Sequence, residues 1–409
     1  MSKGLRVGII GAGIGGVGLA RALQRRGVEF RLFERAAQFG EIGAGVQMTP
    51  NAAKVLAALG LQDEIERVGF LPEAMVGRDW NTGSQLFRTP LRDTCPALFG
   101  AHYYHVHRAD LHAILSRDIP KDAVRFNVQC VGVEPDGPGA VAHFSDGSSY
   151  EADLIVGADG IHSAVRDSLW GEQEARFTGH MCWRALVPVE HYPLPFVGPE
   201  AAFWMGPKAH VVTYYVKGGA AINIVAVAES DAWVAESWTE RSSKEELMAA
   251  YEGWHRNLIA LFELVDTDQV FKWGLFDRDP MKQWSRGRAT LLGDAAHPML
   301  PFLSQGAAMA LEDGYVLAAA LAQFGSGDLG GALRAYEDER LPRTSRVILE
   351  SRERGRIYHV ADAAEKRRRD QEMERQQAEN PNAVGIKAEW VYTYNATDCI
   401  ERFKASAAA

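Results

Sequence analysis

The sequence predicts an α/β fold in which a Rossmann-like domain is interrupted by a mostly antiparallel β domain and followed by a helical C-terminal region. Three observations predict this arrangement. A glycine-rich turn joins an apolar strand to a helix near the N-terminus. Between about residues 181 and 275 the pattern changes to alternating apolar residues, broken by proline and glycine clusters. From about residue 331 the pattern is helical and highly charged.

The first elements follow from residue periodicity. Residues 5–10 predict a short apolar strand, residues 17–26 have helical spacing, Gly27 ends that helix, and residues 29–33 predict a second strand. Further along, residues 103–107 predict a strand and residues 109–117 a helix. Residues 140–157 alternate and turn like a hairpin around Ser145-Asp146-Gly147. The last stretch of that region, residues 154–156, is an apolar strand.

The second half of the chain contains the interrupting domain and the return to the first one. Residues 210–216 and 221–227 alternate as strands, between breaks at 192–199 and 217–219. Residues 289–292 predict another strand, 307–324 a long helix, and 331–378 a charged helical region that ends near Asn380-Pro381. We therefore assign residues 1–75, 100–180 and 275–330 to the nucleotide domain, 76–99 and 181–274 to the β domain, and 331–409 to the helical region.

Composition excludes several classes of protein. The chain has 409 residues, 47% hydrophobic and 24% charged, which is typical of an ordinary globular protein. A net charge of -9 argues against nucleic acid as a partner, and the basic run 366–369 is followed by acids, as on a solvated helix face. Four separated cysteines offer no metal-ligand spacing and indicate reduced thiols. No signal peptide and no apolar run long enough for a membrane span are evident, so we expect a cytoplasmic protein without a metal.

The most specific motif is Gly11-Ala12-Gly13-Ile14-Gly15-Gly16, placed directly between the first strand and the first helix. Gly11 permits the tight turn, Gly13 lets the backbone approach a pyrophosphate, and Gly16 lets helix and strand pack closely. The helix N-terminus offers N–H groups and a positive dipole end to phosphates. Glu34, at the end of the second strand, is placed to accept hydrogen bonds from a ribose. The motif predicts a dinucleotide site.

Two further motifs follow predicted strands. One is Asp159-Gly160-Ile161-His162-Ser163-Ala164-Val165-Arg166, and the other is Gly293-Asp294-Ala295-Ala296-His297-Pro298. Ligands of doubly wound sheets bind at the carboxyl ends of the strands, so Asp294 is placed to hold a ribityl hydroxyl. A helix that opens at Gly306 could stabilise an anionic ring by its dipole. Each aspartate, taken alone, is equally well explained as a helix cap.

In this order the three motifs resemble those of the single-component flavoprotein aromatic hydroxylases, the family of para-hydroxybenzoate hydroxylase and salicylate hydroxylase. The resemblance extends from about residue 4 to the Trp390–Tyr394 segment and implies a non-covalent FAD. It also implies NADH or NADPH as electron donor, O2 as co-substrate, and ring hydroxylation through a hydroperoxyflavin. The implied FAD-binding residues are Gly11, Gly13, Ile14, Gly15, Gly16, Glu34, Arg35, Gly45, Val46, Arg108, Asp159, Arg166, Asp294, Gly306 and Ala307.

A closer resemblance is to 3-hydroxybenzoate 6-hydroxylase, 6-hydroxynicotinate 3-monooxygenase and the salicylate hydroxylases. It implies a small hydroxylated aromatic carboxylate as substrate and leaves open which one, and whether its carboxylate is lost. His210 and Tyr214 match a pair that lines the substrate pocket of these enzymes. Phe302 replaces a histidine of the 6-hydroxynicotinate enzymes, and Pro301 replaces a glutamine of the 3-hydroxybenzoate enzymes. These two residues and Trp204 are the expected pocket walls.

The resemblance gives His210 and Tyr214 the catalytic roles. An electrophilic oxygen attacks a phenolate more readily than a phenol, and a phenol with a pKa near 10 needs a base at neutral pH. His210 is the candidate base, with a structural histidine as the alternative. Tyr214 is expected to hydrogen-bond the carboxylate or the ring hydroxyl. The alternative functions are a flavoprotein oxidase or reductase and a non-catalytic FAD-binding protein. The helical tail is interpreted as a packing or homodimer face.

Overall fold

The computed structural model describes residues 4–40, 44–189, 194–230, 240–381 and 388–408. Its first layer is a five-stranded parallel sheet in the order β17-β11-β1-β2-β7, the arrangement of a Rossmann-like domain. The strands are β1 (Arg6–Ile10), β2 (Glu29–Phe33), β7 (Val124–Arg125), β11 (Leu154–Gly157) and β17 (Ala289–Leu291). The strands predicted near residues 5, 29, 154 and 289 are therefore confirmed.

Helices cover this sheet, and glycines bring two of them close together. A Cβ added at Gly314 in α9 would lie 2.9 Å from the backbone nitrogen of Leu19 in α1, so the helices cross at backbone contact. A three-stranded antiparallel sheet adjoins the domain. The helices are α1 (Ile14–Gln24), α2 (Pro50–Ala58), α3 (Gln62–Val68), α5 (Arg108–Ser116), α6 (Ala164–Trp170) and α9 (Gly306–Phe324); the strands are β8 (Cys130–Glu134), β9 (Ala140–Phe144) and β10 (Ser149–Ala152).

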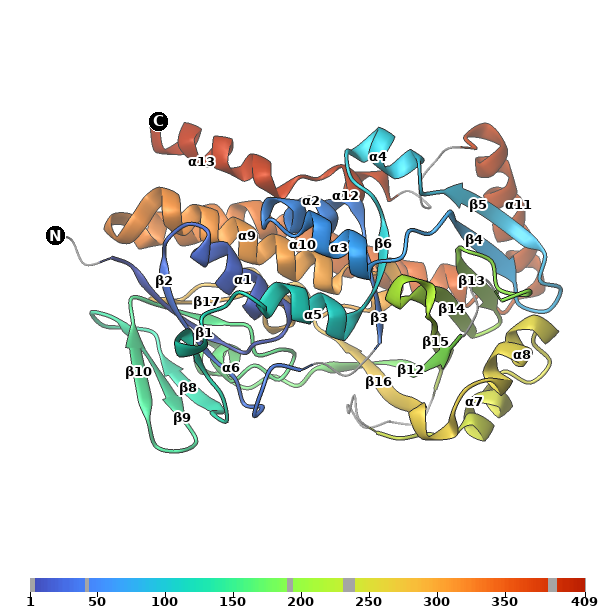
Figure 1. Ribbon diagram of the computed structural model, residues 1–409, viewed down its shortest axis with the longest axis horizontal. Helices are drawn as coiled ribbons and strands as arrows, with labels where there is room; N and C mark the ends of the chain where they lie inside the picture. Colours follow the sequence, from blue (N-terminus) through green and yellow to red (C-terminus); the bar gives the residue numbers. More distant parts are fainter. Residues whose placement is uncertain (1–3, 41–43, 190–193, 231–239, 382–387, 409) are drawn as a thin grey trace.

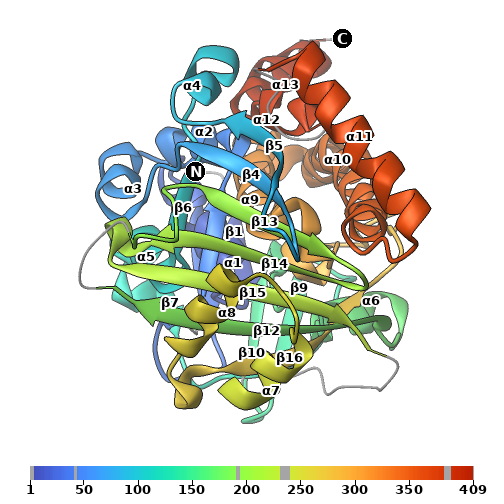
Figure 2. The same ribbon diagram turned by 90° about the vertical axis from the view of Figure 1, so that its right-hand side faces the viewer.

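The second layer is a seven-stranded sheet at the other end of the molecule's long axis (Figure 1), in the order β16-β12-β15-β14-β13-β4-β5. All its pairs are antiparallel except β13 with β4. Figure 2 shows α7 and α8 against one face of this sheet. The elements are β4 (Ala74–Asp79), β5 (Gln85–Pro90), β12 (Arg176–Pro188), β13 (Ala201–Gly206), β14 (Ala209–Val216), β15 (Ala221–Glu229), β16 (Phe271–Asp277), α7 (Lys244–Ala250) and α8 (Arg256–Glu263).

A two-stranded ribbon, β3 with β6, lies between the two large sheets, and Gly45 of β3 donates a hydrogen bond to Asn223 of β15. The ribbon and its neighbouring helix are β3 (Gly45–Met48), β6 (Tyr104–His107) and α4 (Thr94–Phe99). Short 3-10 turns complete the chain: η1 (Lys121–Ala123), η2 (Lys217–Gly219), η3 (Thr267–Gln269), η4 (Gly293–Ala295), η5 (Pro301–Leu303), η6 (Gly325–Asp328) and η7 (Ala396–Asp398).

The C-terminal region is not one continuous helix. It consists of α10 (Leu329–Tyr358), α11 (Ala363–Glu379), α12 (Glu389–Thr393) and α13 (Cys399–Ala408). Two buried arginines of α10 bind two buried carboxylates of α9, so α10 belongs to the core of the first domain. The stretch 306–358 is the one described helical segment long and apolar enough to cross a membrane by composition, but its most apolar part is more than half buried. Core helices of globular proteins pass the same test.

Candidate active site

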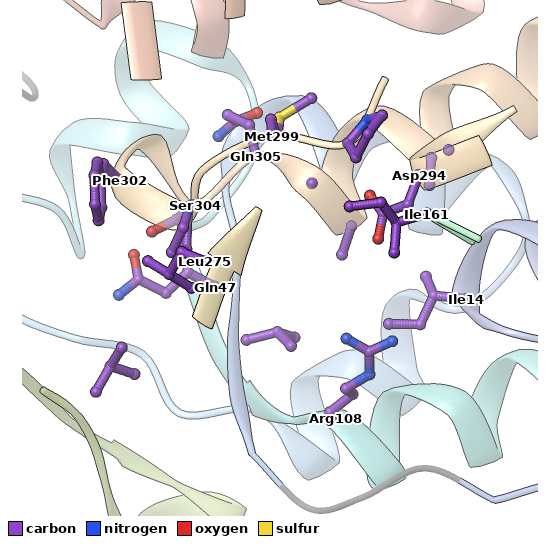
Figure 3. Close-up of a pocket in the computed structure, with 18 of the residues that line it drawn as sticks. Ile14, Gln47, Arg108, Ile161, Leu275, Asp294, Met299, Phe302, Ser304 and Gln305 are labelled. Atoms are coloured by element: carbon purple, nitrogen blue, oxygen red, sulfur yellow. The ribbon is translucent and has the colours of Figure 1, made fainter. Parts of the chain in front are cut away.

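A cavity of about 300 Å³ lies between the carboxyl edge of the parallel sheet and the inner face of the seven-stranded sheet. Figure 3 shows Ile14, Arg108 and Asp294 on one side of this cavity and Phe302 and Ser304 on the other. Of the residues predicted to form the site, thirteen line it: Gly13, Ile14, Gly15, Gly45, Val46, Arg108, His210, Tyr214, Asp294, Pro301, Phe302, Gly306 and Ala307. Residues far apart in sequence thus meet in one space.

The glycine turn has the backbone geometry that its sequence predicts. Gly11 has a φ of +98°, and a Cβ at Gly16 would lie 1.9 Å from the carbonyl oxygen of Gly11. No side chain fits between the turn and the helix, so α1 begins directly behind the strand. Gly13 is the N-cap of α1 and lines the cavity. The helix therefore presents its free N–H groups to the cavity.

Glu34 and Arg35 lie at the end of β2 but do not line the cavity. The Glu34 carboxylate accepts hydrogen bonds of 2.8 Å from the backbone N–H groups of Ala12 and Ala36. It therefore fixes the glycine turn, and its remaining lone pairs stay available to a ribose. The Arg35 side chain is exposed.

Asp159 and Arg166 support the cavity from behind rather than lining it. Asp159 accepts hydrogen bonds from the Ser163 hydroxyl (2.5 Å) and the backbone N–H of Val165 (3.3 Å), and burial raises the pKa of its carboxyl. It shapes the loop whose Gly160 and Ile161 reach the cavity. Arg166 is buried and its guanidinium lies 3.5 Å from the carbonyl oxygen of Ala295, which joins the second motif to the third.

The third motif places Asp294 at the cavity and His297 away from it. His297 is buried, and its Nε2 lies 2.5 Å from Oδ2 of Asp313, which also accepts from the backbone N–H of Gly293. His297 therefore anchors the loop to α9. Gly306 and Ala307 are the first residues of α9 and line the cavity, so the N-terminus of this nineteen-residue helix faces the same space.

The inner face of the seven-stranded sheet forms the other wall. His210, Val212 and Tyr214 alternate along β14 and line the cavity, because side chains two apart in a strand share a face. A Cβ at Gly45 would lie 2.7 Å from the Tyr214 hydroxyl, so this glycine lets the tyrosine approach β3. Burial raises the pKa of Tyr214 far above its usual range, which keeps the phenol a neutral hydrogen-bond donor.

Trp204 is not a cavity wall, contrary to the prediction. It lies on the outer face of the sheet, where its ring stacks on His255 with centroids 5.5 Å apart and packs with the Arg78 guanidinium. Its neighbour Phe203 lines the cavity instead. Side chains alternate between the two faces of strand β13, so Phe203 and Trp204 point to opposite faces. The sequence did not determine which of the two faces the cavity.

His210 is 2% exposed, and burial together with the nearby His359 and His180 rings holds its pKa well below the usual range. Its Nδ1 lies 2.6 Å from Nε2 of His359, and its ring contacts Phe302 with centroids 5.1 Å apart. His210 is therefore neutral at physiological pH. A neutral imidazole retains a lone pair that can accept a proton.

Sequence reasoning missed several lining residues, among them Arg184, Gln47 and Trp273. Arg184 lies on β12, and its guanidinium packs over the Trp273 ring at 4.7 Å. A charged residue two positions from Cys182 and from Leu186, in the apolar second half of this strand, is the signal that could have found it. Among the described residues, Arg184 and Arg108 are the arginines that line the cavity.

These features fit the FAD that the resemblance implies. Two helix N-termini face one cavity, the turn leaves no room for a side chain at Gly11 or Gly16, and Asp294 lines the same cavity. Phosphates are stabilised at helix N-termini, and a carboxylate accepts hydrogen bonds from hydroxyl groups. Phe203, Val212 and Phe302 give the cavity an apolar wall, which suits contact with an aromatic ring.

Comparison with known proteins agrees with this site. The family model "FAD binding domain" matches residues 4–351. The chain is 42% identical over 394 residues to the 3-amino-4-hydroxybenzoate 2-monooxygenase PtmB3 of Streptomyces platensis, covering 96% of each chain. It is 40% identical to the 6-hydroxynicotinate 3-monooxygenase of Bordetella bronchiseptica, over 84% of this chain and 89% of that one. A salicylate hydroxylase substrate complex superposes with a TM-score of 0.81 at 26% identity, over 98% of both chains.

The match covers most of the chain, and the relatives above 30% identity span nearly its whole length. The resemblance and the α/β fold class stated from the sequence are confirmed. The chain belongs to the FAD-binding family of aromatic hydroxylases, and the protein is an FAD-dependent aromatic-ring monooxygenase.

Proposed function

We propose that the protein hydroxylates a small aromatic carboxylate bearing a ring hydroxyl, with NADH or NADPH as electron donor and O2 as oxidant. The observation that carries this proposal is the meeting of His210, Tyr214 and Arg184 in the cavity that also contains the glycine turn. Both named monooxygenase relatives act on a ring that has a carboxylate and a hydroxyl group. A guanidinium suits the carboxylate, and a neutral imidazole suits the hydroxyl.

Bound FAD supplies the redox chemistry by accepting a hydride and passing electrons to O2. The reaction balances as aromatic C–H, O2, NAD(P)H and a proton giving aromatic C–OH, water and NAD(P)⁺. If the attacked carbon carries the carboxylate, CO2 leaves in place of the proton. The protein's part is to bind and orient the ring, exclude water, and move the hydroxyl proton.

Each of these tasks has a candidate residue. Arg184 would bind the carboxylate, and Phe203, Val212 and Phe302 would hold the ring by apolar contact. His210 would accept the proton of the ring hydroxyl, which makes the ring electron-rich. The Tyr214 hydroxyl would donate a hydrogen bond to the substrate.

A substrate panel tests the proposal. The purified protein should oxidise NADH several-fold faster with the correct member of a set containing 3-amino-4-hydroxybenzoate, 6-hydroxynicotinate, 3-hydroxybenzoate and salicylate. Product and CO2 are measured beside NADH consumption, with NADPH in parallel. Benzoate is the control, since it lacks the hydroxyl and should give hydrogen peroxide without hydroxylated product. NADH oxidation that is indifferent to all these acids would favour an oxidase or reductase.

We also propose that the protein acts in the cytoplasm and that its helical region forms a homodimer face. All four cysteines are buried free thiols, which suits a reducing compartment. Light scattering of the purified holoenzyme measures the oligomeric state directly. A monomeric mass would contradict the proposed homodimer.

A further inference from the structure

Two histidines and one glutamate meet behind the predicted base, His210. In the antiparallel pair of β12 and β15, His180 lies directly opposite Glu229, and His210 on β14 lies opposite Val227, two residues before that glutamate. His359, the C-cap of α10, reaches this corner from the C-terminal region. One ring nitrogen each of His180 and His359 and one carboxylate oxygen of Glu229 lie within 4.8 Å of one another.

The contact between His210 and His359 contains a single proton. His210 Nδ1 and His359 Nε2 are 2.6 Å apart, so one nitrogen donates and the other accepts. Burial, with His180 nearby, lowers the pKa of His359 to about 3, and the pKa of His210 is also well below its usual range. Both rings are therefore neutral at physiological pH, and the question is which one carries the shared proton.

The surroundings of the other His359 nitrogen answer this question. Nδ1 of His359 is buried, forms no hydrogen bond with the described residues, and lies 3.5 Å from Oε1 of Glu229. A lone pair there would face the negative carboxylate, whereas an N–H would be attracted to it. The proton of neutral His359 therefore belongs on Nδ1, and its Nε2 is left as an acceptor.

His180 favours the same state. The Thr178 hydroxyl donates its proton to the carbonyl oxygen of Leu275 at 2.8 Å, so the 3.1 Å contact between Thr178 Oγ1 and His180 Nδ1 needs the proton from the histidine. With its proton on Nδ1, neutral His180 has only a lone pair on Nε2. In this tautomer His180 offers no N–H donor from Nε2 to the cluster of His180, Glu229 and His359.

We propose that His359, oriented by Glu229, is a positioning residue that accepts a hydrogen bond from Nδ1 of His210 and so keeps the His210 Nε2 lone pair free for the substrate hydroxyl. This inference rests on the proposed function, in which His210 accepts the hydroxyl proton. Without His359, nothing in the described surroundings holds the proton on Nδ1. A neutral imidazole with its proton on Nε2 would donate to the substrate instead of accepting from it.

The same residues offer a route by which the proton taken from the substrate hydroxyl can reach solvent. When the ring hydroxyl gives its proton to Nε2 of His210, the Nδ1 proton can pass to Nε2 of His359. The Nδ1 proton of His359 would then pass to the carboxylate of Glu229 when these two groups, 3.5 Å apart in the structure, close to hydrogen-bond distance. Each ring gains one proton and loses one, and the Glu229 side chain is 41% exposed, so the last proton reaches solvent.

Two variants of His359 in the holoenzyme test the inference. In His359→Gln the side-chain carbonyl oxygen can still accept from His210 Nδ1, whereas in His359→Leu nothing can. We expect His359→Leu to lower the hydroxylation rate about 10–100-fold, part of the 10²–10⁴-fold effect of a general base. His359→Gln should retain most of the rate. The control is His143→Leu, which removes an exposed histidine that contacts Glu134 at 3.0 Å and should have no effect.

A second substrate separates positioning from a structural role. A fluorinated analogue whose ring hydroxyl is ionised at the assay pH needs no base, so His359→Leu should hydroxylate it at nearly the wild-type rate. Equal loss with both substrates, or no loss with either, overturns the inference.

The ¹⁵N chemical shifts of the histidine rings give a readout that does not depend on turnover. In the wild-type holoenzyme His210 should carry its proton on Nδ1, and in His359→Leu this signal should change. A wild-type proton on Nε2 overturns the inference, as does stoichiometric zinc in the purified protein that holds the ring nitrogens. If the expected tautomer is found but no phenolic acid is hydroxylated, the proposed function fails and the positioning contact stands.

Discussion

His210 combines burial with a neutral charge, and this combination defines the chemistry available at the cavity. Its pKa lies well below the usual range because the folded protein does not solvate an imidazolium there. The ring is therefore always ready to accept a proton but holds one poorly. A base of this kind works only if the proton is passed on, which is why the contact with His359 belongs to the same mechanism.

His210→Ala should lower the hydroxylation rate by about 10²–10⁴-fold, the usual loss for a missing general base. FAD content should stay normal, and hydrogen peroxide per NADH should rise because the ring is not ionised. The measurement is hydroxylated product per NADH consumed, together with the substrate dissociation constant. Tyr214→Phe is the companion variant and should change mainly substrate affinity. Wild-type coupling in His210→Ala would return this residue to a structural role.

Phe203 and Trp204 form a matched pair because they are adjacent on β13 but lie on opposite faces of the sheet. Phe203→Leu should change the KM for the aromatic acid, since Phe203 lines the cavity. Trp204→Leu should lower the melting temperature and leave KM within about twofold, because its ring packs with His255 and Arg78. A larger KM change for Trp204→Leu than for Phe203→Leu would contradict the assignment of the two faces.

At the scale of elements, the site is made where α1 and α9 begin. The two helices cross at glycine contacts and direct their N-termini to one cavity, while β14 supplies the opposite wall. The turn before α1 is the least tolerant part of this arrangement, since backbone atoms rather than flexible side chains occupy the space beside Gly16.

Gly16→Ala should abolish FAD retention. Its Cβ would lie 1.9 Å from the carbonyl oxygen of Gly11, so the turn must open and the N–H groups of α1 move away from the phosphates. FAD per protein is measured by absorbance, with circular dichroism to verify folding. Gly327→Ala is the control, because nothing lies within 4 Å of its added Cβ. A folded Gly16→Ala protein with a full complement of FAD would refute this account of the turn.

At the scale of the whole molecule, a buried ion cluster joins the C-terminal region to the first domain. Glu312 and Asp313 of α9 bind Arg340 and Arg343 of α10, and the Asn51 amide donates to Glu312 at 2.7 Å. Burial alone would raise the pKa of Glu312, but the Arg343 and Arg340 charges outweigh it and hold that pKa below the ordinary 4.5. The cluster holds α10, the first long helix of the C-terminal region, against α9. The N-terminus of α9 lies at the cavity.

Arg340→Met should lower the free energy of unfolding by about 3–5 kcal/mol, because it leaves buried carboxylates without their partner. Denaturant unfolding of the holoenzyme measures this, and Arg375→Met, which removes an exposed cation, should cause no detectable change. Since the folded-state pKa of Glu312 is lowered, the cluster's contribution is complete above pH 4.5 and is lost as pH falls through the folded pKa. A wild-type stability that stays constant between pH 6 and pH 3 would contradict this.

The sequence by itself determined the elements and motifs whose causes are local. The turn at Gly11–Gly16 depends on backbone conformations that only glycine adopts readily, and β2 and α9 follow from short-range periodicity. Only the tertiary structure decided which side of a strand faces the cavity, because a shift of one residue exchanges Phe203 for Trp204. It alone placed Arg184 beside the cavity and brought His359, 149 positions away in sequence, to His210. No periodicity records such contacts, since they depend on how separate elements pack.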